Sequence, residues 1–483
     1  MGTNVHFGND VRQLKYEVLK GVAKLAYNNM LEEGKDDLPY QIIPGKEAKF
    51  RCCVYKEREI LRQRIRAATG KMAQDGVVIV LEDACEGCPI TRYTVTENCQ
   101  RCVAKKCVTE CPFGAISITG KGAYIDPDKC RECGRCVKAC PYNAISDTLR
   151  PCLRSCPVDA ISIDDNKHAE IKQDRCISCG ACTNDCPFGA ITDTSSIVDV
   201  IEHIKGKRPV YAIFAPAIEG QFGDTNIAGI VEGLKGLGFT DAVEVALGAD
   251  AVAKHEAQEL KDAIEHDGKL TTSCCPAFYN MVEKHFPRAI NNVSHTASPM
   301  TVTARYIRHE EPSAIVVFIG PCIAKKQEAR SAPDSADYVI SFEELAAMLD
   351  ARDIELRSID PHDMEDCNDA SKFGKGFALS GGVTGAVLRV FEEDNYDKLF
   401  SHLKCNGARE CKKALQMLGA GRLNETFVEG MACENGCIAG PVGILPLRQA
   451  MNNRKKLMEQ ADDRTINENL QKHDFSEINL LRK

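Results

Sequence analysis

The residues of this chain with the clearest chemical potential are its cysteines, of which there are 26 in 483 residues. Sixteen of them lie between Cys85 and Cys186, most in C-x2-C and C-x3-C-P spacings. Five more lie downstream, within residues 272–276, 320–322 and 431–437. Thiolates are ligands for iron–sulfur clusters and zinc. The first group therefore predicts a relay of metal clusters for electrons, and the second predicts where those electrons go.

Composition limits the setting in which these thiols act. Residues 1–10 show no apolar signal core, so we expect reduced thiols in a cytoplasmic protein rather than disulfides. Apolar runs such as residues 76–81 and 314–319 are far shorter than the ~20 residues that span a bilayer. The formal charge of -8 disfavours binding to nucleic-acid phosphates. We therefore expect a soluble protein with neither a membrane nor a nucleic-acid partner.

The chain divides by composition into three predicted domains. Residues 1–80 have apolar residues at helical spacing and predict a small helical accessory region. Residues 81–193 hold the dense cysteines and predict an α+β, ferredoxin-like iron–sulfur domain. Residues 194–483 alternate strand-like runs (210–214, 242–247, 315–319) with helical stretches, which is typical of an α/β domain. Their end, residues 452–483, is polar and predicts a surface helix or tail.

A weak internal repeat organises the iron–sulfur region. The pattern C-P-x-x-A-I recurs at Cys111, Cys140, Cys156 and Cys186. Bacterial ferredoxins bind one [4Fe-4S] cluster with the run C-x2-C-x2-C, and the C-P cysteine crosses to the neighbouring cluster. Four such endings predict four half-modules. Zinc bound by C-x2-C pairs is the alternative, but it does not explain four C-P endings at the same offset from Ala-Ile.

The crossing rule divides the sixteen cysteines into four predicted clusters. The groups are Cys99, Cys102, Cys107 with Cys140; Cys130, Cys133, Cys136 with Cys111; Cys176, Cys179, Cys182 with Cys156; and Cys85, Cys88, Cys152 with Cys186. The pairs Cys85/Cys88 and Cys99/Cys102 could exchange roles, so this choice stays open.

Other cysteines and histidines have no convincing site. Adjacent Cys52 and Cys53 are expected to be buried small residues. Cys367, Cys405 and Cys411 are unassigned, although the last two could touch each other. Three isolated histidines are expected to be structural; they are His285, His295 and His309.

The downstream cysteines resemble the three signature motifs of [FeFe]-hydrogenases. The motifs are TSCCP at 272–276, GPCIAKKQE at 320–328 and EGMACENGCIAG at 429–440. The resemblance covers about residues 210–440 and implies a two-lobed α/β catalytic domain with the H-cluster between its lobes. It also implies a [4Fe-4S] cluster on Cys275, Cys322, Cys433 and Cys437. Cys437 would bridge to a diiron subsite with carbonyl, cyanide and azadithiolate ligands.

The spacing of Cys433 and Cys437 is compatible with this ligand role. A C-x3-C spacing can place two sulfurs on one face of a helical turn, and Gly436 would permit close metal approach.

The resemblance also implies contacts around the diiron subsite. Lys325 matches the lysine that hydrogen-bonds a cyanide ligand, while Lys326 is expected to be its solvated neighbour. Met431 would pack near the subsite, and Ala215 with Pro216 would contact cyanide at a strand end. Gly381 and Gly382 resemble a glycine-rich turn near the cofactor.

A proton route is implied as well. Cys274 looks like the family's proton-relay cysteine, because adjacent Cys275 already serves as the cluster ligand. Glu259, Ser294 and Glu328 align with the family's proton path, Glu259 lying in a helical EAQEL stretch at 256–260.

Several residues depart from the commonest family pattern. The chain has no tryptophan, and Gly320, Met300 and Ala263 stand where methionine, glutamine and the arginine at the end of the proton path are usual. The third motif continues into Pro441 rather than into glycines. These changes spare the ligands and alter their surroundings, and they resemble a monomeric, ferredoxin-linked branch called group B.

These observations predict an iron hydrogenase that interconverts dihydrogen with protons and electrons. Ferredoxin or a similar low-potential carrier near roughly -400 mV would be the redox partner, and maturation proteins would supply the diiron subsite. Two alternatives use the same cysteines: a non-catalytic cluster-assembly or sensory protein, and a pure electron-transfer polyferredoxin. Assembly-type relatives lack the full diiron environment, so Cys274, Lys325 and Met431 favour the enzyme.

Overall fold

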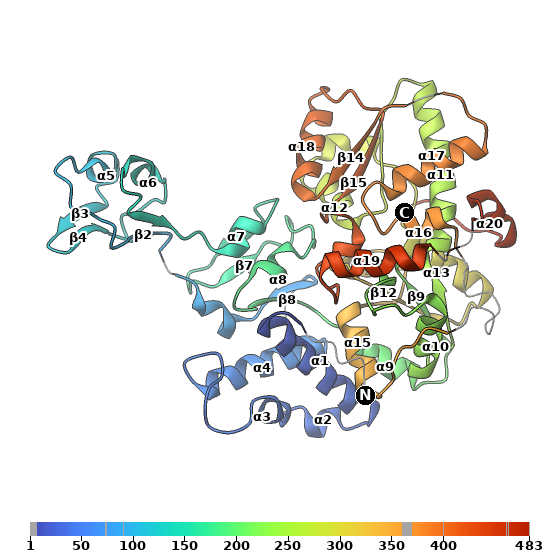
Figure 1. The fold of residues 1–483 in the computed structure, drawn as a ribbon, viewed down its shortest axis with the longest axis horizontal. Helices are drawn as coiled ribbons and strands as arrows, with labels where there is room; N and C mark the ends of the chain where they lie inside the picture. The colour runs from blue at the N-terminus through green and yellow to red at the C-terminus, as the bar shows by residue number, and fades with distance from the viewer. Residues whose placement is uncertain are drawn as a thin grey trace.

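The computed structural model describes residues 7–72, 75–89, 91–359, 370–398, 400–459, 461 and 463–482. Cys367 lies outside these residues. Helices at the N-terminus, two small iron–sulfur units and a larger α/β part follow one another along the chain (Figure 1). None of the helices in the described part of the chain has the length and apolar character that crossing a membrane requires.

The N-terminal helices fold against the catalytic part of the chain. They are α1 (Asp10–Tyr27), α2 (Leu31–Gly34), α3 (Leu38–Ile42) and α4 (Val54–Ala68). The Asn9 side chain accepts a hydrogen bond from the Arg12 N–H and so caps α1. The buried face of α1, including Leu19 and Val22, packs against α15 (Phe342–Ala351) and α9 (Ile197–Ile204). Cys52 and Cys53 are exposed just before α4, so the expected burial of this pair is wrong.

The cysteine-rich region forms two units, each built from short hairpins and single-turn helices. The outer unit contains β2 (Tyr93–Val95), α5 (Lys106–Thr109), β3 (Ile116–Thr119), β4 (Gly122–Ile125), α6 (Arg135–Ala139) and β5 (Ile145–Asp147). The inner unit contains β1 (Val78–Val80), η1 (Glu82–Gly87), α7 (Pro151–Ser155), β6 (Ile161–Ile163), β7 (Ala169–Ile171), α8 (Ala181–Asp185) and β8 (Ile191–Asp193). Strand β1 pairs with β8 in antiparallel register.

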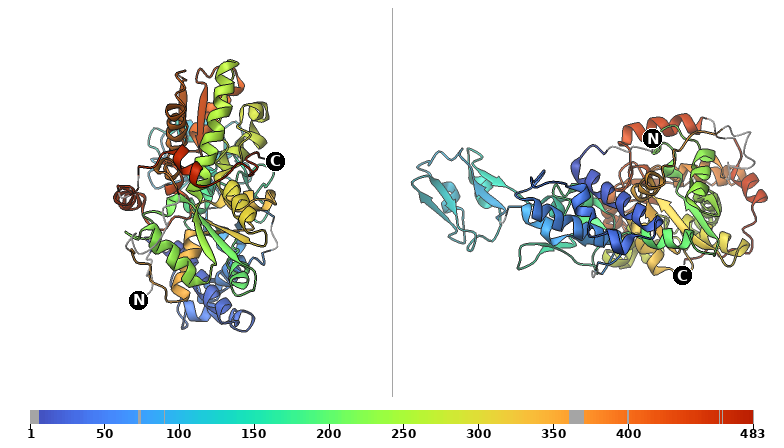
Figure 2. Two further views of the ribbon diagram at one scale, coloured as in Figure 1. Left: turned by 90° about the vertical axis from the view of Figure 1, so that its right-hand side faces the viewer. Right: turned by 90° about the horizontal axis from the view of Figure 1, so that it is seen from below.

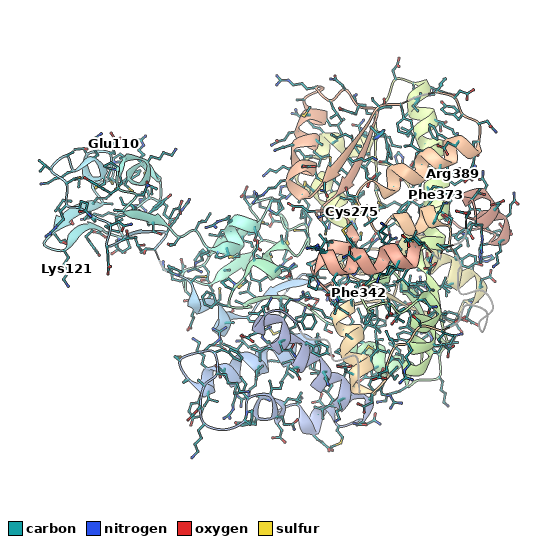
Figure 3. The ribbon with its side chains drawn as sticks, viewed as in Figure 1. Glu110, Lys121, Cys275, Phe342, Phe373 and Arg389 are labelled. Atoms are coloured by element: carbon teal, nitrogen blue, oxygen red, sulfur yellow. The ribbon has the colours of Figure 1, made fainter. Side chains whose placement is uncertain are left out.

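The outer unit stands at one end of the molecule, away from the N-terminal helices and the catalytic part (Figure 2). Glu110 and Lys121 mark that end, whereas Cys275 lies within the catalytic part (Figure 3). The inner unit lies between them.

The C-P-x-x-A-I repeat has one structural explanation in all four copies. The alanine N–H donates a hydrogen bond to the sulfur of the C-P cysteine, at 3.4 Å for Cys111 and Cys140, 3.2 Å for Cys156 and 3.3 Å for Cys186. The residue before each alanine has a positive φ between 49° and 59°, which glycine, asparagine and aspartate tolerate best. Those residues are Gly114, Asn143, Asp159 and Gly189. The repeat therefore encodes a turn that directs an N–H at a ligand sulfur.

Two parallel sheets confirm the prediction of an α/β fold for the C-terminal part of the chain. The first has the order β10 (Asp241–Glu244), β9 (Val210–Phe214), β12 (Ile315–Gly320) and β13 (Tyr338–Ser341). Every residue of central β12 is buried, as expected when helices cover both faces. The predicted strand at 242–247 is a strand only to Glu244, because α11 (Val245–Glu265) begins at the next residue. The short connection places the start of α11 at the sheet edge.

The second sheet has the order β11 (Leu270–Thr271), β15 (Phe427–Met431) and β14 (His402–Asn406). Its neighbouring helices are α12 (Pro276–His285), α17 (Gly382–Glu393) and α18 (Ala408–Gly419). Further helices are α10 (Ile227–Leu237), α13 (Pro299–Glu310), α14 (Ile323–Ser331), α16 (Lys372–Gly376), α19 (Leu447–Met458) and α20 (Ile466–Lys472), with the short turns η2 (Pro216–Ile218), η3 (Pro287–Asn292) and η5 (Cys437–Ala439).

The C-terminal segment is not only a surface tail. Ile466 and Asn469 of α20 are fully buried against the catalytic part, and Leu481 forms an antiparallel bridge with Thr296. Much of the segment is polar, as predicted, but residues such as Ile466 and Asn469 pack against the rest of the protein.

A buried ion network joins three parts of the chain. Lys326 Nζ lies 2.7 Å from Asp193 Oδ2 and 2.8 Å from Glu344 Oε2. Lys15 of α1 pairs with the same Asp193 at 2.5 Å and with Glu343 at 2.8 Å. The expectation that Lys326 is solvated is therefore wrong. Burial alone would lower its pKa, but the two carboxylates raise it, so the side chain stays charged inside.

Replacing Lys326 by methionine should weaken the fold. Lys326→Met leaves Glu344 buried without its cation, and loss of one partner of a buried pair costs roughly 3 kcal/mol. We expect the free energy of unfolding in urea to fall by about that amount. Lys207→Met, at an exposed lysine, should change it by less than about 0.5 kcal/mol. Equal stability of both variants would contradict a stabilising role for the network.

Candidate active site

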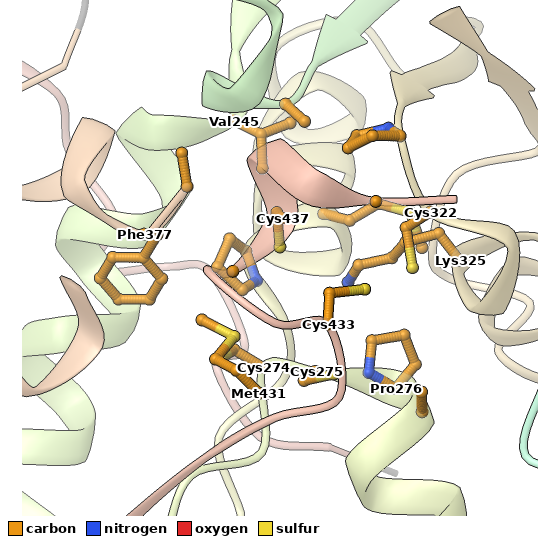
Figure 4. A pocket seen from close by; sticks show the side chains of 18 of the residues that line it. Val245, Cys274, Cys275, Pro276, Cys322, Lys325, Phe377, Met431, Cys433 and Cys437 are labelled. Carbon is orange, nitrogen blue, oxygen red and sulfur yellow. The ribbon is translucent and has the colours of Figure 1, made fainter. Parts of the chain in front are cut away.

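Four cysteines from three separate segments line one cavity of about 80 Å³ (Figure 4). Cys275 caps α12 and Cys322 caps α14, while Cys433 and Cys437 follow the end of β15. The rest of the lining is mostly apolar and includes Val245, Pro276 and Phe377. The two sheets and their helices thus bring sulfurs that are far apart in sequence to one space.

The backbone between Cys433 and Cys437 differs from the expected helical turn. Asn435 and Gly436 both have positive φ, 69° and 87°, and η5 begins only at Cys437. A Cβ on Gly436 would lie 2.5 Å from Ser380 N and 2.6 Å from Leu379 C. The positive φ and the close packing both require glycine at position 436. Gly436 also lines the cavity.

The electrostatics of the cavity call for a cation. Burial and the charge of Cys275 raise the pKa of Cys322 to about 11. Burial and the charges of Cys322 and Cys275 also raise the pKa of Cys437. Four thiolates in such a place are stable only when bound metal compensates their charge. No three Cys, His, Asp or Glu side chains among the described residues converge on a single ion. The four thiols instead line the wall of one cavity, as the ligands of a multi-iron cluster would, so the residues fit the predicted group.

Lys325 is the cation that lines the cavity. Its Nζ donates to Glu328 Oε2 at 2.6 Å, and Arg482 lies 3.6 Å from the other oxygen of Glu328. Burial would raise the pKa of Glu328, but Lys325 and Arg482 lower it. An ammonium has three N–H donors, so Glu328 leaves two of them for a ligand in the cavity.

Glu328 does not join the other residues of the expected proton path. Its partners are Lys325 and Arg482, whereas Glu259 and Ser294 contact each other, with Ser294 Oγ donating to Glu259 Oε2 at 2.5 Å. Glu328 therefore belongs with Lys325.

Glu256 is the residue that sequence reasoning missed. It is fully buried on α11, one turn before Glu259, and Ser273 N–H donates to it at 3.2 Å. Ser294 lies beside it, although Glu256 Oε2 has no hydrogen-bond partner among the described residues, and the charge of Glu256 acts on Cys274. Burial raises the pKa of Glu256 to about 8, so it is largely protonated at neutral pH. The E-x-x-E spacing on one helical face was the available signal.

Polar groups continue from Glu259 to the surface. His295 Nδ1 lies 3.2 Å from Glu259 Oε1, and 75 % of the His295 side chain is exposed. Thr296 Oγ1 donates to Glu259 Oε2 at 3.0 Å and lies 2.7 Å from His255 Nδ1. The C-terminal segment holds this loop, since Arg482 N–H donates to the His295 carbonyl at 2.6 Å. His295, expected to be structural, therefore lies at the outer end of a buried carboxylate chain.

Some of the remaining residues that were predicted to contact the cofactor line the cavity, and others lie beside it. Ala215, Pro216, Met431 and Cys274 line the cavity. Gly381 and Gly382 do not: Gly381 begins α17 with a φ of 88°, and its N–H donates to Glu429 at 2.6 Å. Their role is to turn the chain beside the site.

Two unassigned cysteines, Cys405 and Cys411, are buried next to each other, as the sequence allowed. Cys411 Sγ donates to the Met431 carbonyl at 3.4 Å, and neither thiol lines the cavity.

The cysteines of the inner unit approach one another in the groups that the crossing rule predicts. Cys152 lies within electrostatic range of Cys186, Cys88 and Cys85. Cys182 lies within range of Cys179, Cys176 and Cys156, and after these of Cys152. In the outer unit, Cys107 has Cys140 and Cys102 as neighbours. These neighbours favour Cys85/Cys88 in the inner unit over the exchanged arrangement.

Cys179 connects the two groups of cysteines. It lines the same cavity as Cys322 and Cys433, and its charge acts on Cys433. The inner unit therefore reaches the wall of the candidate site.

Comparison with protein families gives three matches. Residues 208–441 match the C-terminal domain of the iron-only hydrogenase large subunit. Residues 123–146 match a 4Fe-4S binding domain, and residues 146–197 match the LdpA Fe-S cluster-binding domain.

Individual relatives fall into two kinds. Iron hydrogenase 1 of Clostridium pasteurianum is 27% identical over 285 residues, which cover 48% of this chain and 50% of that protein. The match thus spans about half the length of that relative. A cytosolic Fe-S cluster assembly factor, NAR1 of Kluyveromyces lactis, is 33% identical over 102 residues, or 20% of this chain and 22% of the factor.

Among solved structures, a variant of [FeFe]-hydrogenase HydA1 from Chlamydomonas reinhardtii matches with a TM-score of 0.47 and 22% identity, covering 58% of this chain and 94% of that one. The family match covers all four cysteines of the cavity, together with Cys274, Lys325 and Met431. Residues 208–441 of this chain are therefore similar to the C-terminal domain of the iron-only hydrogenase large subunit.

Proposed function

We propose that this chain is a hydrogenase that interconverts dihydrogen with protons and electrons. One observation carries the proposal: four cysteines, Lys325, Met431 and the non-ligand thiol of Cys274 all line one apolar cavity, whose wall also includes Cys179 of the inner iron–sulfur unit. A site of this kind offers a cluster anchor, a proton acceptor and an electron exit together.

The four cysteines would hold the [4Fe-4S] part of the H-cluster, with Cys437 shared with a diiron subsite that carries carbonyl, cyanide and azadithiolate. When bound, this group supplies the heterolytic cleavage of dihydrogen. The two N–H groups that Lys325 keeps free of Glu328 would hold a cyanide in place. Met431 and the prolines and phenylalanines of the lining exclude water from the site. Maturation proteins would deliver the diiron subsite.

Protons would move between the cavity and solvent through named side chains. Cys274 exchanges a proton with Glu256, Ser294 connects Glu256 to Glu259, and Glu259 passes the proton to His295 at the surface. A pKa of Glu256 near 8 suits transfer in both directions at neutral pH. Position 263, where the family pattern has arginine, is alanine, and His295 supplies a titratable group in its place.

Electrons would leave through four [4Fe-4S] clusters. The cluster of Cys156, Cys176, Cys179 and Cys182 lies beside the cavity, and the outer unit lies at the far end of the molecule (Figure 1). A ferredoxin or a similar low-potential carrier would exchange electrons at the outer unit. The terminal position of that unit makes it accessible to such a protein.

A cluster-assembly role is the second candidate, favoured by the match to the yeast assembly factor. Such a role would need the [4Fe-4S] ligands but no diiron subsite. The cavity places Cys274 and Lys325 beside the four thiols, which favours the enzyme.

Infrared spectroscopy of the matured protein tests the proposal directly. We expect carbonyl and cyanide bands of a bound diiron subsite, together with hydrogen evolution from a reduced electron donor. Cys437→Ala should abolish both, because it removes the shared thiolate. Cys405→Ala, at a buried cysteine outside the cavity, should retain both.

Absence of the bands after maturation, with [4Fe-4S] iron retained, would instead support the assembly role. Normal hydrogen evolution in Cys437→Ala would contradict the ligand assignment.

Glu256 provides a test of the proton route. Glu256→Gln cannot relay a proton, and loss of a positioned acid–base group lowers turnover roughly 100-fold or more. The infrared bands should persist, since no ligand changes. Glu265→Gln, an exposed position at the end of the same helix, should keep wild-type turnover. Unchanged turnover in Glu256→Gln would remove this residue from the route.

A further inference from the structure

One predicted cluster is surrounded by guanidinium groups. Its ligands, which define the Cys186 cluster, are Cys85, Cys88, Cys152 and Cys186. Arg64 of α4 donates from Nη2 to the Gly189 carbonyl at 2.8 Å, and Arg51 donates to the Phe188 carbonyl at 2.9 Å. Both carbonyls belong to the turn that follows Cys186. Arg150, two residues before Cys152, donates to the Lys167 carbonyl at 2.7 Å.

Two of these cations are buried and lack an anionic partner. Arg64 is 6% exposed and Arg150 is 7% exposed. Within the described ranges neither forms an ion pair, and Arg64 Nε has no hydrogen-bond partner. A buried charge without a counter-charge costs several kcal/mol. The charges that act on them in this part of the structure include the cysteine ligands: Arg64 interacts with Arg51 and with Cys186, and Arg150 acts on Cys85 and Cys88.

The neighbouring cluster sites have a different environment. Lys284 acts on Cys176 of the cluster beside the cavity, and Arg101 acts on Cys99 of the outer unit, but both cations are exposed. Water and salt screen exposed charges far more than buried ones. Arg51 is also partly screened, because it is only partly buried in the cavity between α4 and the inner unit, whereas Arg64, which lines the same cavity, is 6% exposed. Arg64 and Arg150 should therefore have the largest electrostatic effect on the Cys186 cluster.

We propose that Arg64 and Arg150 are the counter-charges of the Cys186 cluster and give it the highest reduction potential of the four accessory clusters. Reduction adds one electron and no proton, so the reduced cluster is more negative and gains more from nearby buried cations. The electron comes from a one-electron carrier, which is oxidised in turn. Dihydrogen chemistry uses two electrons, and the Cys186 cluster would hold the first one close to the cavity.

This inference rests on the cluster assignment within the proposed function, and does not depend on hydrogen turnover. It also gives the N-terminal helices a role, since α4 supplies Arg64. The competing view is that both arginines only clamp the ligand turns to their neighbours. The two views differ in the variants below, because a clamp affects iron retention while a counter-charge affects potential.

The test is a redox titration followed by electron paramagnetic resonance, on full-length protein that carries its [4Fe-4S] clusters but has not received the diiron subsite. We expect one cluster to have a more negative midpoint in Arg64→Met and in Arg150→Met, and more negative still in the double variant. Cys152→Ser identifies that signal as the Cys186 cluster. Arg64→Lys, which keeps the charge, should restore most of the wild-type midpoint.

Arg175→Met is the matched control. Arg175 also binds a carbonyl in a ligand turn, Val158 at 3.2 Å, but from an exposed position, so its loss should leave all midpoints unchanged. If Arg64→Met and Arg150→Met both keep their iron and show unchanged midpoint reduction potentials, the proposal is overturned. Loss of the cluster in every arginine variant, Arg64→Lys included, would show that the arginines are clamps and would overturn it equally. Failure of hydrogen evolution alone would bear only on the proposed function.

Discussion

The buried contact among Lys326, Asp193 and Glu344 fixes the inner cysteine-rich unit against the part of the chain that holds the candidate cavity. Asp193 ends the last strand of the inner unit, seven residues after Cys186, and Lys326 lies on the helix that begins at Cys322. Glu344 adds the capping box of α15, on which α1 packs. Separating these groups would expose unpaired charges to a low-dielectric interior, at a cost of several kcal/mol. The relay and the cavity wall are therefore held in one geometry, with Cys179 reaching that wall.

A second constraint follows from burying so many thiols. Burial raises the pKa of Cys179 to about 12 and of Cys152 to about 11, so these sites disfavour free thiolates. Iron reverses this preference because it binds only the deprotonated form. Backbone N–H groups donate hydrogen bonds to the sulfurs of Cys156 and Cys186 and so stabilise their thiolates. The folded backbone holds these donors in place. Folding of the cysteine-rich region and cluster insertion are thus one thermodynamic event.

The sequence predicted those features that local spacing encodes. The four C-P turns, the grouping of inner cysteines and the strands at 210–214 and 315–319 depend on contacts between near neighbours or on apolar runs. Features that depend on distant partners were missed. Lys326 looked solvated because Asp193 lies 133 positions away, and Glu256 lacked significance until Ser273 and Ser294 were placed beside it. Glu328 aligned with the proton path by motif, yet the helical turn that it shares with Lys325 determines its partner.

The proposed proton and electron routes use different elements of the fold. The two carboxylates of the proton route lie on α11, and Ser294 and His295 of the loop at 294–296 contact Glu259. The cysteines of the relay approach from the inner unit and meet the cavity at Cys179, near Cys322 and Cys433. Cys274 and Cys275 are adjacent in sequence, but Cys274 interacts with Glu256 and Cys275 with Cys322. Cys274 and Cys275 therefore have different neighbours although one peptide bond joins them. The proposed proton route begins at Cys274, and the proposed electron route begins at Cys275.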